Sequence, residues 1–316
     1  MKVQLTAGSD YGSLLESLTG PIKPSTLNSK FREKFVQDFR YLRCNASGNL
    51  AKFLDYITYE YMIGNVVMIM MGLSRGEELD REELIKRCHP LGMVDLMPAL
   101  TVSRNLGDLY TTVLVETPIG PYFKSLLTNL KFTGELTELN VELVRMALWK
   151  AYLEDFDQWC GEELDDASGR TMHEILSFEA DRRTISIAVN SIGTSLAKEI
   201  RLQLLPKLGK LSDWGLLEKL AYADDPSQIR QPIDSLLPEY RSLIDAAIAG
   251  KTGDDSLFQS RTPFDLNSSI ASFEVLATER EVALCKDAFF NQFTMTPFYA
   301  WCKLVEQERR NLVWIA

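Results

Sequence analysis

Residues 140–160 read NVELVRMALWKAYLEDFDQWC, and their spacing decides the fold class. Apolar side chains recur three and four positions apart, which places them on one face of an α-helix. The apolar series is Val141, Val144, Leu148, Tyr152, Phe156 and Trp159, and only Arg145 and Asp155 intrude on its flanks. The stretch therefore predicts an amphipathic helix that buries one face against the rest of the protein.

Similar spacing recurs along most of the chain, whereas the alternation typical of strands is sparse. Helices are expected over residues 29–43, 50–73, 81–88, 105–115, 171–203, 213–222 and from 273 to the C-terminus. Clusters of Gly, Pro and Asp predict breaks at 20–24, 90–98, 117–121, 131–134, 162–169, 205–209 and 250–263, the last being the best linker candidate. These patterns together predict an all-α fold.

Composition narrows the function classes. The chain has 316 residues, of which 46% are hydrophobic, so it can bury a sizeable core. Its 34 Lys and Arg face 44 Asp and Glu, and the net charge of −10 disfavours binding to nucleic acid or anionic lipid. The five cysteines are widely spaced and form no CxxC pair, so we expect reduced thiols. No apolar signal-peptide stretch follows the start of the chain.

The most apolar stretch, residues 53–73, is about as long as a membrane span. Asp55, Glu60 and Asn65 interrupt it, and its continuous apolar part is only residues 66–73. A buried helix of a soluble core is therefore the favoured interpretation, and any membrane association would come through a partner.

Histidine and cysteine offer little for catalysis. The chain has two histidines, His89 and His173, and Cys88 directly precedes the first of them. Neighbouring residues point in different directions on a helix or a strand, so Cys88 and His89 do not form the hydrogen bond that a thiolate nucleophile needs. Structural packing before Pro90 is the favoured interpretation.

Paired acids occur at residues 165–166, 224–225 and 254–255, and none completes a DDxxD pattern. They fall in expected turns, where Asp caps helices. The chain also lacks a GxxxxGK[ST] phosphate loop. We therefore expect no catalytic, cofactor-binding or metal-binding residues.

Three segments suggest an internal repeat. Each opens with Glu, carries Asn or Thr five residues later and continues into a mainly apolar run. The segments are EYMIGNVVMIM from Glu60, EADRRTISIAV from Glu179 and EQERRNLVWIA from Glu306. Three related helical units are one interpretation, and a chance alignment of Glu- and Arg-rich helices is the other.

Two of these segments contain dense charges at helical spacing. Glu179 can reach Arg182 or Arg183, and Glu306 can reach Arg309 or Arg310, because residues three and four apart are neighbours on a helix. The flanking runs are apolar, so these six residues are candidates for semi-buried ion pairs that fix helix register rather than for acid–base catalysis.

Eight collinear strings resemble one protein family. They are DYGSLL at 10–15, FLDYITYEYMIGNV at 53–66, CHPLG at 88–92, LYTTVLVETPIGPYF at 109–123, KAYLEDF at 150–156, FEADRR at 178–183, GKLSDWGLLEKLAYADD at 209–225 and FYAWCKLVEQERRNLVWIA at 298–316. Together they span nearly the whole chain. The family they resemble is the d subunits of eukaryotic vacuolar-type proton ATPases, relatives of the C subunits of archaeal and bacterial A/V-type ATPases.

The resemblance implies a single domain, 1–316, shaped like a funnel, with three helical lobes at about 1–120, 121–210 and 211–316. It implies a non-catalytic protein without cofactors that couples the central stalk, with its shaft subunits D and F, to the proteolipid c-ring. Such a subunit is peripheral and lies on the cytoplasmic face of a vacuolar or other endomembrane. The family pattern extends beyond both ends of this sequence, so we expect a truncated chain.

Two other functions remain open from the residues alone. The chain could be a free-standing helical adaptor, or a helical hydrolase that uses Cys88 or one of the Asp pairs. A rotor subunit should copurify with shaft and ring subunits, an adaptor should not, and a hydrolase should lose turnover when those residues are changed.

Overall fold

The computed structural model describes residues 11–12, 23–74, 81–93, 117–123, 138–252, 272–291 and 293–315. All regular elements in these ranges are helices, so the expected all-α class is confirmed for the part of the chain that is described. The expected helix at 105–115 and the expected break at 131–134 lie outside these residues.

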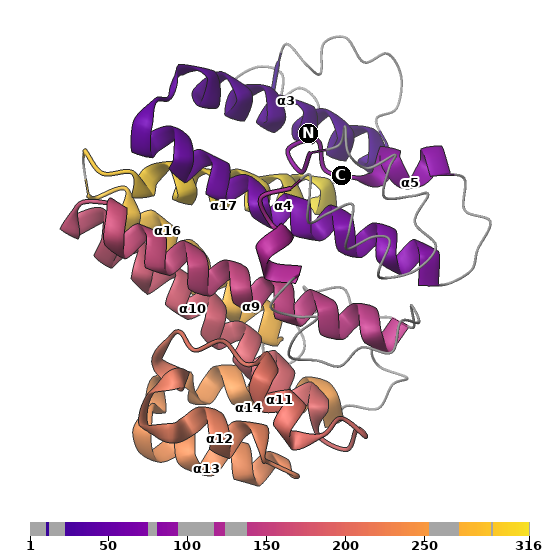
Figure 1. Ribbon diagram of the computed structural model, residues 1–316, viewed down its shortest axis with the longest axis vertical. Coiled ribbons are helices and arrows are strands. Elements are labelled where there is room, and N and C mark those ends of the chain that lie inside the picture. Colours follow the sequence, from indigo (N-terminus) through magenta and orange to yellow (C-terminus); the bar gives the residue numbers. More distant parts are fainter. Residues whose placement is uncertain are drawn as a thin grey trace.

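Three helical hairpins build the larger part of the molecule (Figure 1). In each hairpin two long helices are joined by a short turn. The pairs are α3 (Pro24–Asn45) with α4 (Gly48–Ser74), α9 (Glu138–Glu163) with α10 (Asp166–Ser191), and α16 (Phe273–Ala288) with α17 (Thr296–Ile315). One hairpin falls within each of the three ranges expected for the lobes, although the lobes and the funnel shape themselves stay predictions.

The hairpins pack side by side in a closed order. Helix α4 packs on α9, α10 packs on α16, and α17 returns to pack on α3. We call this arrangement the six-helix ring. Helices α4 and α10, the second helices of the first two hairpins, also touch α17. Aromatic side chains fill the α4–α9 contact, where the ring of Tyr56 stacks on those of Phe156 and Trp159 at 5.0 and 5.1 Å between centroids.

Short helices form a second layer beside α10, at the lower end of the molecule in Figure 1. They are α11 (Lys198–Leu204), the 3-10 helix η2 (Lys210–Gly215), α12 (Leu216–Ala221), α13 (Pro226–Leu236), the 3-10 helix η3 (Pro238–Tyr240) and α14 (Arg241–Thr252). At the other end, α5 (Arg81–Arg87) packs on α4.

Two expected helices are each divided in the structure. The helix expected over 171–203 ends at Ser191, because Gly193 adopts φ +73° and stops it, as glycine commonly does after a helix end. The helix expected from 273 onward ends at Ala288 and a new one starts at Thr296. Phe293, between them, adopts φ +65°, and Pro297 lies in the first turn of the new helix, where proline is well tolerated.

Helices α13 and α14 were not among the expected helices, and prolines such as Pro226, Pro232 and Pro238 disfavour a helix interior. Pro226 instead occupies the first turn of α13, where proline lacks only a hydrogen bond that the position would not make. Asp225 caps that helix by accepting hydrogen bonds from the backbone N–H groups of Ser227 and Gln228.

The apolar stretch 53–73 lies within α4, and most of its side chains are buried. Among the helices that the structure describes, none combines the length and apolar character needed to cross a membrane.

Candidate functional site

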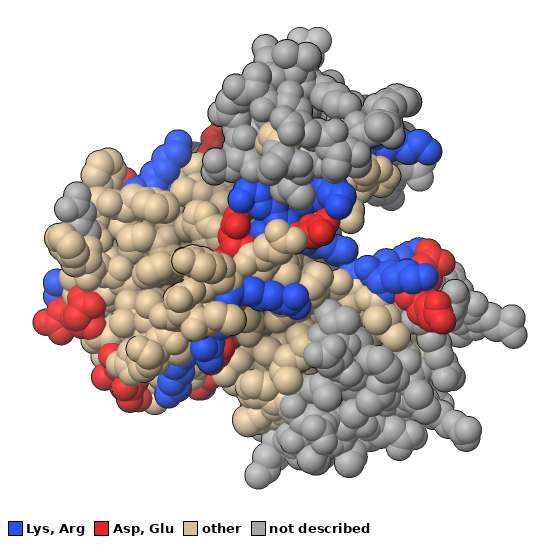
Figure 2. All heavy atoms as spheres, turned by 90° about the horizontal axis from the view of Figure 1, so that it is seen from above, with Lys and Arg blue, Asp and Glu red and all other residues tan. Residues whose placement is uncertain are grey.

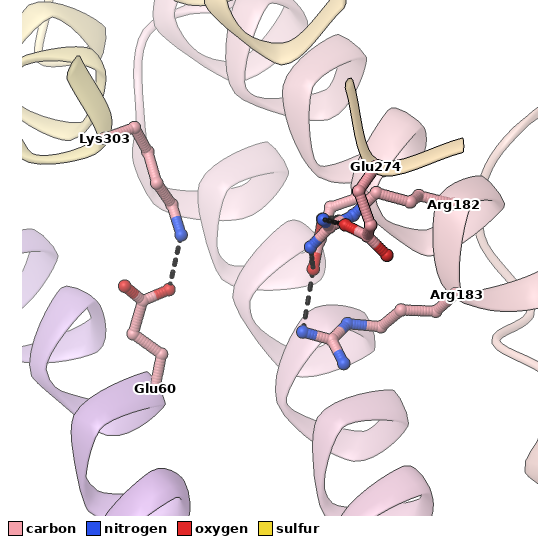
Figure 3. Close-up of polar contacts among 6 residues, drawn as sticks. Glu60, Arg182, Arg183, Glu274 and Lys303 are labelled. Carbon is pink, nitrogen blue, oxygen red and sulfur yellow. Dashed lines mark hydrogen bonds and ion pairs between the residues drawn. The ribbon is translucent and has the colours of Figure 1, made fainter. Parts of the chain in front are cut away.

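Charged side chains are buried at the centre of the six-helix ring, where α4, α10 and α17 approach one another (Figure 3). The Nζ atom of Lys303 on α17 lies 2.7 Å from Oε2 of Glu60 on α4. Their side chains are only 17% and 7% exposed. This ion pair joins the first hairpin to the third.

A second group of charges surrounds Glu179 on α10. Its carboxylate accepts from Nε of Arg182 at 2.8 Å and lies 2.7 Å from a guanidinium nitrogen of Arg183. Arg182 also reaches Glu274 on α16, at 3.5 Å. The guanidinium of Arg183 stacks over the ring of Trp149 on α9, 3.7 Å from its centroid. Of these contacts, the one between Arg182 and Glu274 ties the second hairpin to the third, and the others lie within the second hairpin.

The electrostatics favour the charged forms of Glu179 and Lys303 but not that of Glu60. Burial alone would raise the pKa of Glu179, but Arg183 and Arg182 lower it to about 2. Burial alone would lower the pKa of Lys303, but Glu60 and Tyr299 raise it well above its usual value. Burial also raises the pKa of Glu60, and Lys303 opposes that shift. The carboxylates therefore depend on their cationic partners to remain ionised inside the protein.

The second glutamate that the sequence analysis singled out, Glu306, has other partners than expected. It accepts a hydrogen bond from the hydroxyl of Tyr61 at 3.1 Å. Arg309 donates to the side chain of Asn28 on α3, and Arg310 is exposed. The structure thus pairs neither arginine with Glu306, and that expectation is wrong. The reason is tertiary: α17 packs against α3 and α4, which supply these partners.

The glutamates that open the three repeat segments nevertheless gather in one region. Both Glu306 and Glu179 contribute to raising the pKa of Glu60, as neighbouring negative charges do. The sequence analysis did not single out Lys303, which lies among them. A lysine within the apolar run FYAWCKLV, residues 298–305, was the available signal.

The Cys88 and His89 pair does not form a nucleophile and base. Cys88 is buried and its thiol donates to the carbonyl of Leu84 at 3.4 Å. Burial raises the pKa of that thiol, which disfavours the thiolate. Nδ1 of His89 accepts from the backbone N–H of Leu91 at 3.3 Å. Both residues therefore fix a turn, in agreement with the packing interpretation.

Two of the three Asp pairs cap helices, as expected. Asp165 accepts from the N–H groups of Ala167 and Ser168 at the start of α10, and Asp225 caps α13 in the same way. The pair at 254–255 lies outside the described residues. Within the described ranges, no three or more His, Cys, Asp or Glu residues gather as a metal site would require.

Another buried carboxylate, Asp181, was missed by the sequence analysis. It is fully buried and accepts from the N–H groups of Lys210 and Leu211 at 3.0 and 2.9 Å and from the hydroxyl of Tyr240 at 2.7 Å. It thereby fastens the layer of short helices to α10. Gly209 must be glycine here, because a Cβ on it would lie 2.4 Å from Oδ1 of Asp181.

Asp181 borders a cavity of about 660 Å³ between α10, α14, α16 and residues 207–213. On its wall, Nδ1 of His173 lies 2.9 Å from Asp157, and Nε2 lies 3.5 Å from Oγ of Ser177. This order resembles the acid, base and nucleophile of serine hydrolases. Ser177 lies in the middle of α10, however, so its own N–H is engaged in the helix and cannot serve an oxyanion hole.

Within the described residues, the chain is thus an all-helical protein whose long hairpins are joined by buried ion pairs. The profile of the ATP synthase (C/AC39) subunit family matches residues 1–316, and the chain belongs to that family.

Relatives within the family narrow the assignment further. A protein of Neurospora crassa named V-type proton ATPase subunit d is 44% identical over 323 residues, which cover all of this chain and 84% of the relative. The protein of the same name from Saccharomyces cerevisiae is 37% identical over 318 residues and is covered to 83%. V-type proton ATPase subunit d1 of Arabidopsis thaliana is 37% identical over 316 residues and is covered to 82%. The resemblance drawn from the eight strings is thus confirmed.

Proposed function

We propose that this chain is a non-catalytic subunit of a V-type proton ATPase that couples rotation of the central stalk to the proteolipid c-ring, and so supports ATP-driven proton transport. The observation that carries the proposal is the similarity to proteins named subunit d over the whole of the chain. The contacts in the described part agree with a mechanical role.

A coupling subunit must transmit torque without deforming. Six long helices in closed order bury a contiguous core, and close-packed interiors resist deformation. The ion pair between Lys303 and Glu60 joins the first hairpin to the third, and the one between Arg182 and Glu274 joins the second to the third. Both oppose sliding of one hairpin against another. Charged pairs buried at such contacts can specify register.

The partners we propose are the shaft subunits D and F on one side and the c-ring on the other. The chain would be a peripheral protein on the cytoplasmic face of a vacuolar or other endomembrane, and would need no cofactor. Its net charge of −10 suits partners with basic surfaces, because complementary charge speeds association.

The test is affinity purification of the tagged chain from detergent-solubilised membranes, with mass spectrometry of the copurifying proteins. Recovery of shaft and proteolipid subunits in stoichiometric amounts is expected. Vesicles from cells depleted of the chain should also lose ATP-driven acidification. A stable free monomer, with acidification intact after depletion, would instead favour the free-standing adaptor.

A further inference from the structure

Arg32 on α3 and Arg309 on α17 lie near each other where the two helices meet, and neither pairs with an acid among the residues that the structure describes. Arg309 of α17 donates a hydrogen bond to Oδ1 of Asn28 on α3. Arg32 follows Asn28 by four residues, and residues four apart on a helix share one face. The guanidinium of Arg32 therefore lies on the face of α3 that Arg309 approaches.

The turn that follows α5 closes the other side of this cluster. Phe35, three residues beyond Arg32, has its ring 6.2 Å from that of His89, which stacks on Tyr61 at 4.1 Å. Arg32 thus lies on the part of α3 that faces both α17 and this turn. The pKa values agree with this placement: burial and Arg309 lower the pKa of Arg32, and burial, Arg32 and Arg309 lower that of His89 to about 3.

His89 contributes a neutral donor to the cluster. Its Nδ1 accepts from the N–H of Leu91, so the ring proton resides on Nε2. With a pKa lowered to about 3, the ring is uncharged near neutral pH. The cluster therefore combines two guanidinium groups with one neutral N–H donor.

The acids of the neighbouring turn of α17 are engaged elsewhere. Glu306 accepts from Tyr61, and Glu308 accepts from Tyr11. Within the described ranges, no carboxylate pairs with Arg32 or Arg309. By contrast, Arg182 and Arg183 at the ring centre share Glu179. In a chain with ten more acids than bases, two partly buried arginines that pair with no acid among the described residues are suited to bind an anion from elsewhere.

We propose that Arg32, Arg309 and His89 bind one carboxylate, presented by an acidic side chain of another subunit of the ATPase complex. This inference rests on the proposed function, which supplies the partner chains. The planar fork of a guanidinium matches a carboxylate in bidentate fashion, and a partly buried site strengthens the contact. Figure 2 looks onto the side of the molecule where α3 lies, and shows Lys and Arg side chains, with some Asp and Glu among them, beside a hollow.

The site can be tested on the full chain alone, by titrating sodium acetate while recording the arginine side-chain N–H signals by NMR. The wild type should respond saturably, and Arg32→Gln and Arg309→Gln should each weaken the response roughly tenfold or more. Arg310→Gln, which removes the exposed neighbour on α17, is the matched control and should respond like the wild type. An absent response, or one that survives in both variants, would overturn the proposal.

Two further titrations identify the chemical class and the source of the anion. Sodium phosphate should bind no more tightly than acetate, and a preference for phosphate of about tenfold or more would overturn the choice of a carboxylate. Asp10 directly precedes Tyr11 in the sequence. If acetate bound only to an Asp10→Asn variant, the carboxylate would belong to this chain, and the partner assignment would be wrong.

The last test measures assembly of the complex itself. The tagged double variant Arg32→Glu, Arg309→Glu should recover roughly tenfold less of the other ATPase subunits than Arg310→Glu does, provided that both variants unfold at the temperature of the wild type. Full recovery with the double variant would overturn the proposal. If even the wild type recovers no ATPase subunit, the proposed function fails, and the acetate titration decides on the anion site separately.

Discussion

Glu179 is the acid that two arginines of α10 share, because both Arg182 and Arg183 reach its carboxylate. Glu179→Gln should therefore leave Arg183 without its acid and Arg182 with only the more distant Glu274, at a cost of about 3–5 kcal/mol in the free energy of unfolding. Arg182→Ala should cost less, since Arg183 still pairs with Glu179. Urea unfolding followed by circular dichroism measures both values.

The matched control is Glu142→Gln, which breaks a pair with Arg145 on the solvent-facing side of α9 and should cost no more than about 1 kcal/mol. If the Glu179 and Glu142 variants lose equal stability, the charges at the ring centre are solvated, and they fix no register.

Because of Asp181, the free energy of unfolding should change with pH in the opposite direction to that expected from a surface salt bridge. Burial raises its pKa to about 6, even though Tyr240 and two backbone N–H groups favour the charged form. The folded state thus holds a proton that the unfolded chain, with a pKa of about 3.9, has released. The stabilising contribution is present below about pH 4 and is lost as the pH rises through 6.

Asp181→Asn carries no titrating group at this position. The stability of the wild type relative to this variant should therefore fall by ~2–3 kcal/mol between pH 4 and pH 7. Unfolding free energies measured for both proteins across that range give the difference directly. Parallel curves would show that the three donors hold Asp181 ionised throughout.

At the scale of elements, the turn after α5 is fastened to α4 by one side chain. Asn65 donates to the carbonyls of His89 and Gly92 at 3.0 and 2.9 Å and accepts from the N–H of His89 at 2.6 Å. A Cβ on Gly92 would lie 2.4 Å from Nδ2 of Asn65 and 2.6 Å from the carbonyl oxygen of Tyr61. Gly92→Ala must therefore push the turn away from the helix.

We expect Gly92→Ala to cost about 1–3 kcal/mol, the usual effect of forcing extra volume into a packed site. Gly64→Ala on α4 is the control, because a Cβ there meets nothing within 4 Å. That variant should gain up to about 1 kcal/mol, since alanine favours the helix. Thermal unfolding ranks the two, and equal stability of both variants would show that the turn adapts freely.

The sequence predicted elements wherever the deciding signal was local. Apolar spacing located α4 and α9 to within a few residues, and the Asp residues before α10 and α13 cap helices as expected. The division after Ser191 was missed because the signal there was a single glycine, Gly193, within a long apolar pattern.

The site was less predictable, because its partners are far apart in the chain. The contacts of Glu179 with Arg182 and Arg183 span three and four residues and follow from helix geometry. Lys303 and Glu60 are 243 residues apart, and no local pattern links them. The pairing expected between Glu306 and Arg309 failed for the same reason, since tertiary neighbours on α3 and α4 outcompeted the helix neighbour.

For the whole molecule, the order of packing means that the last hairpin closes the six-helix ring by contacting the first. Helix α17 packs on α3 and also touches α4 and α10. A coupling subunit built in this way is only as stiff as that closure. The buried pair of Lys303 and Glu60 lies at the closure, so its loss should affect both hairpins together.

Lys303→Met tests this closure, because methionine keeps the length of the side chain and removes its charge. Glu60 would be left buried near Glu179 and Glu306 without its cation, which we expect to cost about 3–5 kcal/mol at neutral pH. Hydrogen exchange of the backbone should rise in α4 and α17 together and remain unchanged in α13 and α14. The double variant Glu60→Leu, Lys303→Met should recover most of the stability, since an apolar pair can replace a buried ion pair. Faster exchange confined to α17 would mean that the first hairpin holds its place independently, and that torque would have to pass through other contacts.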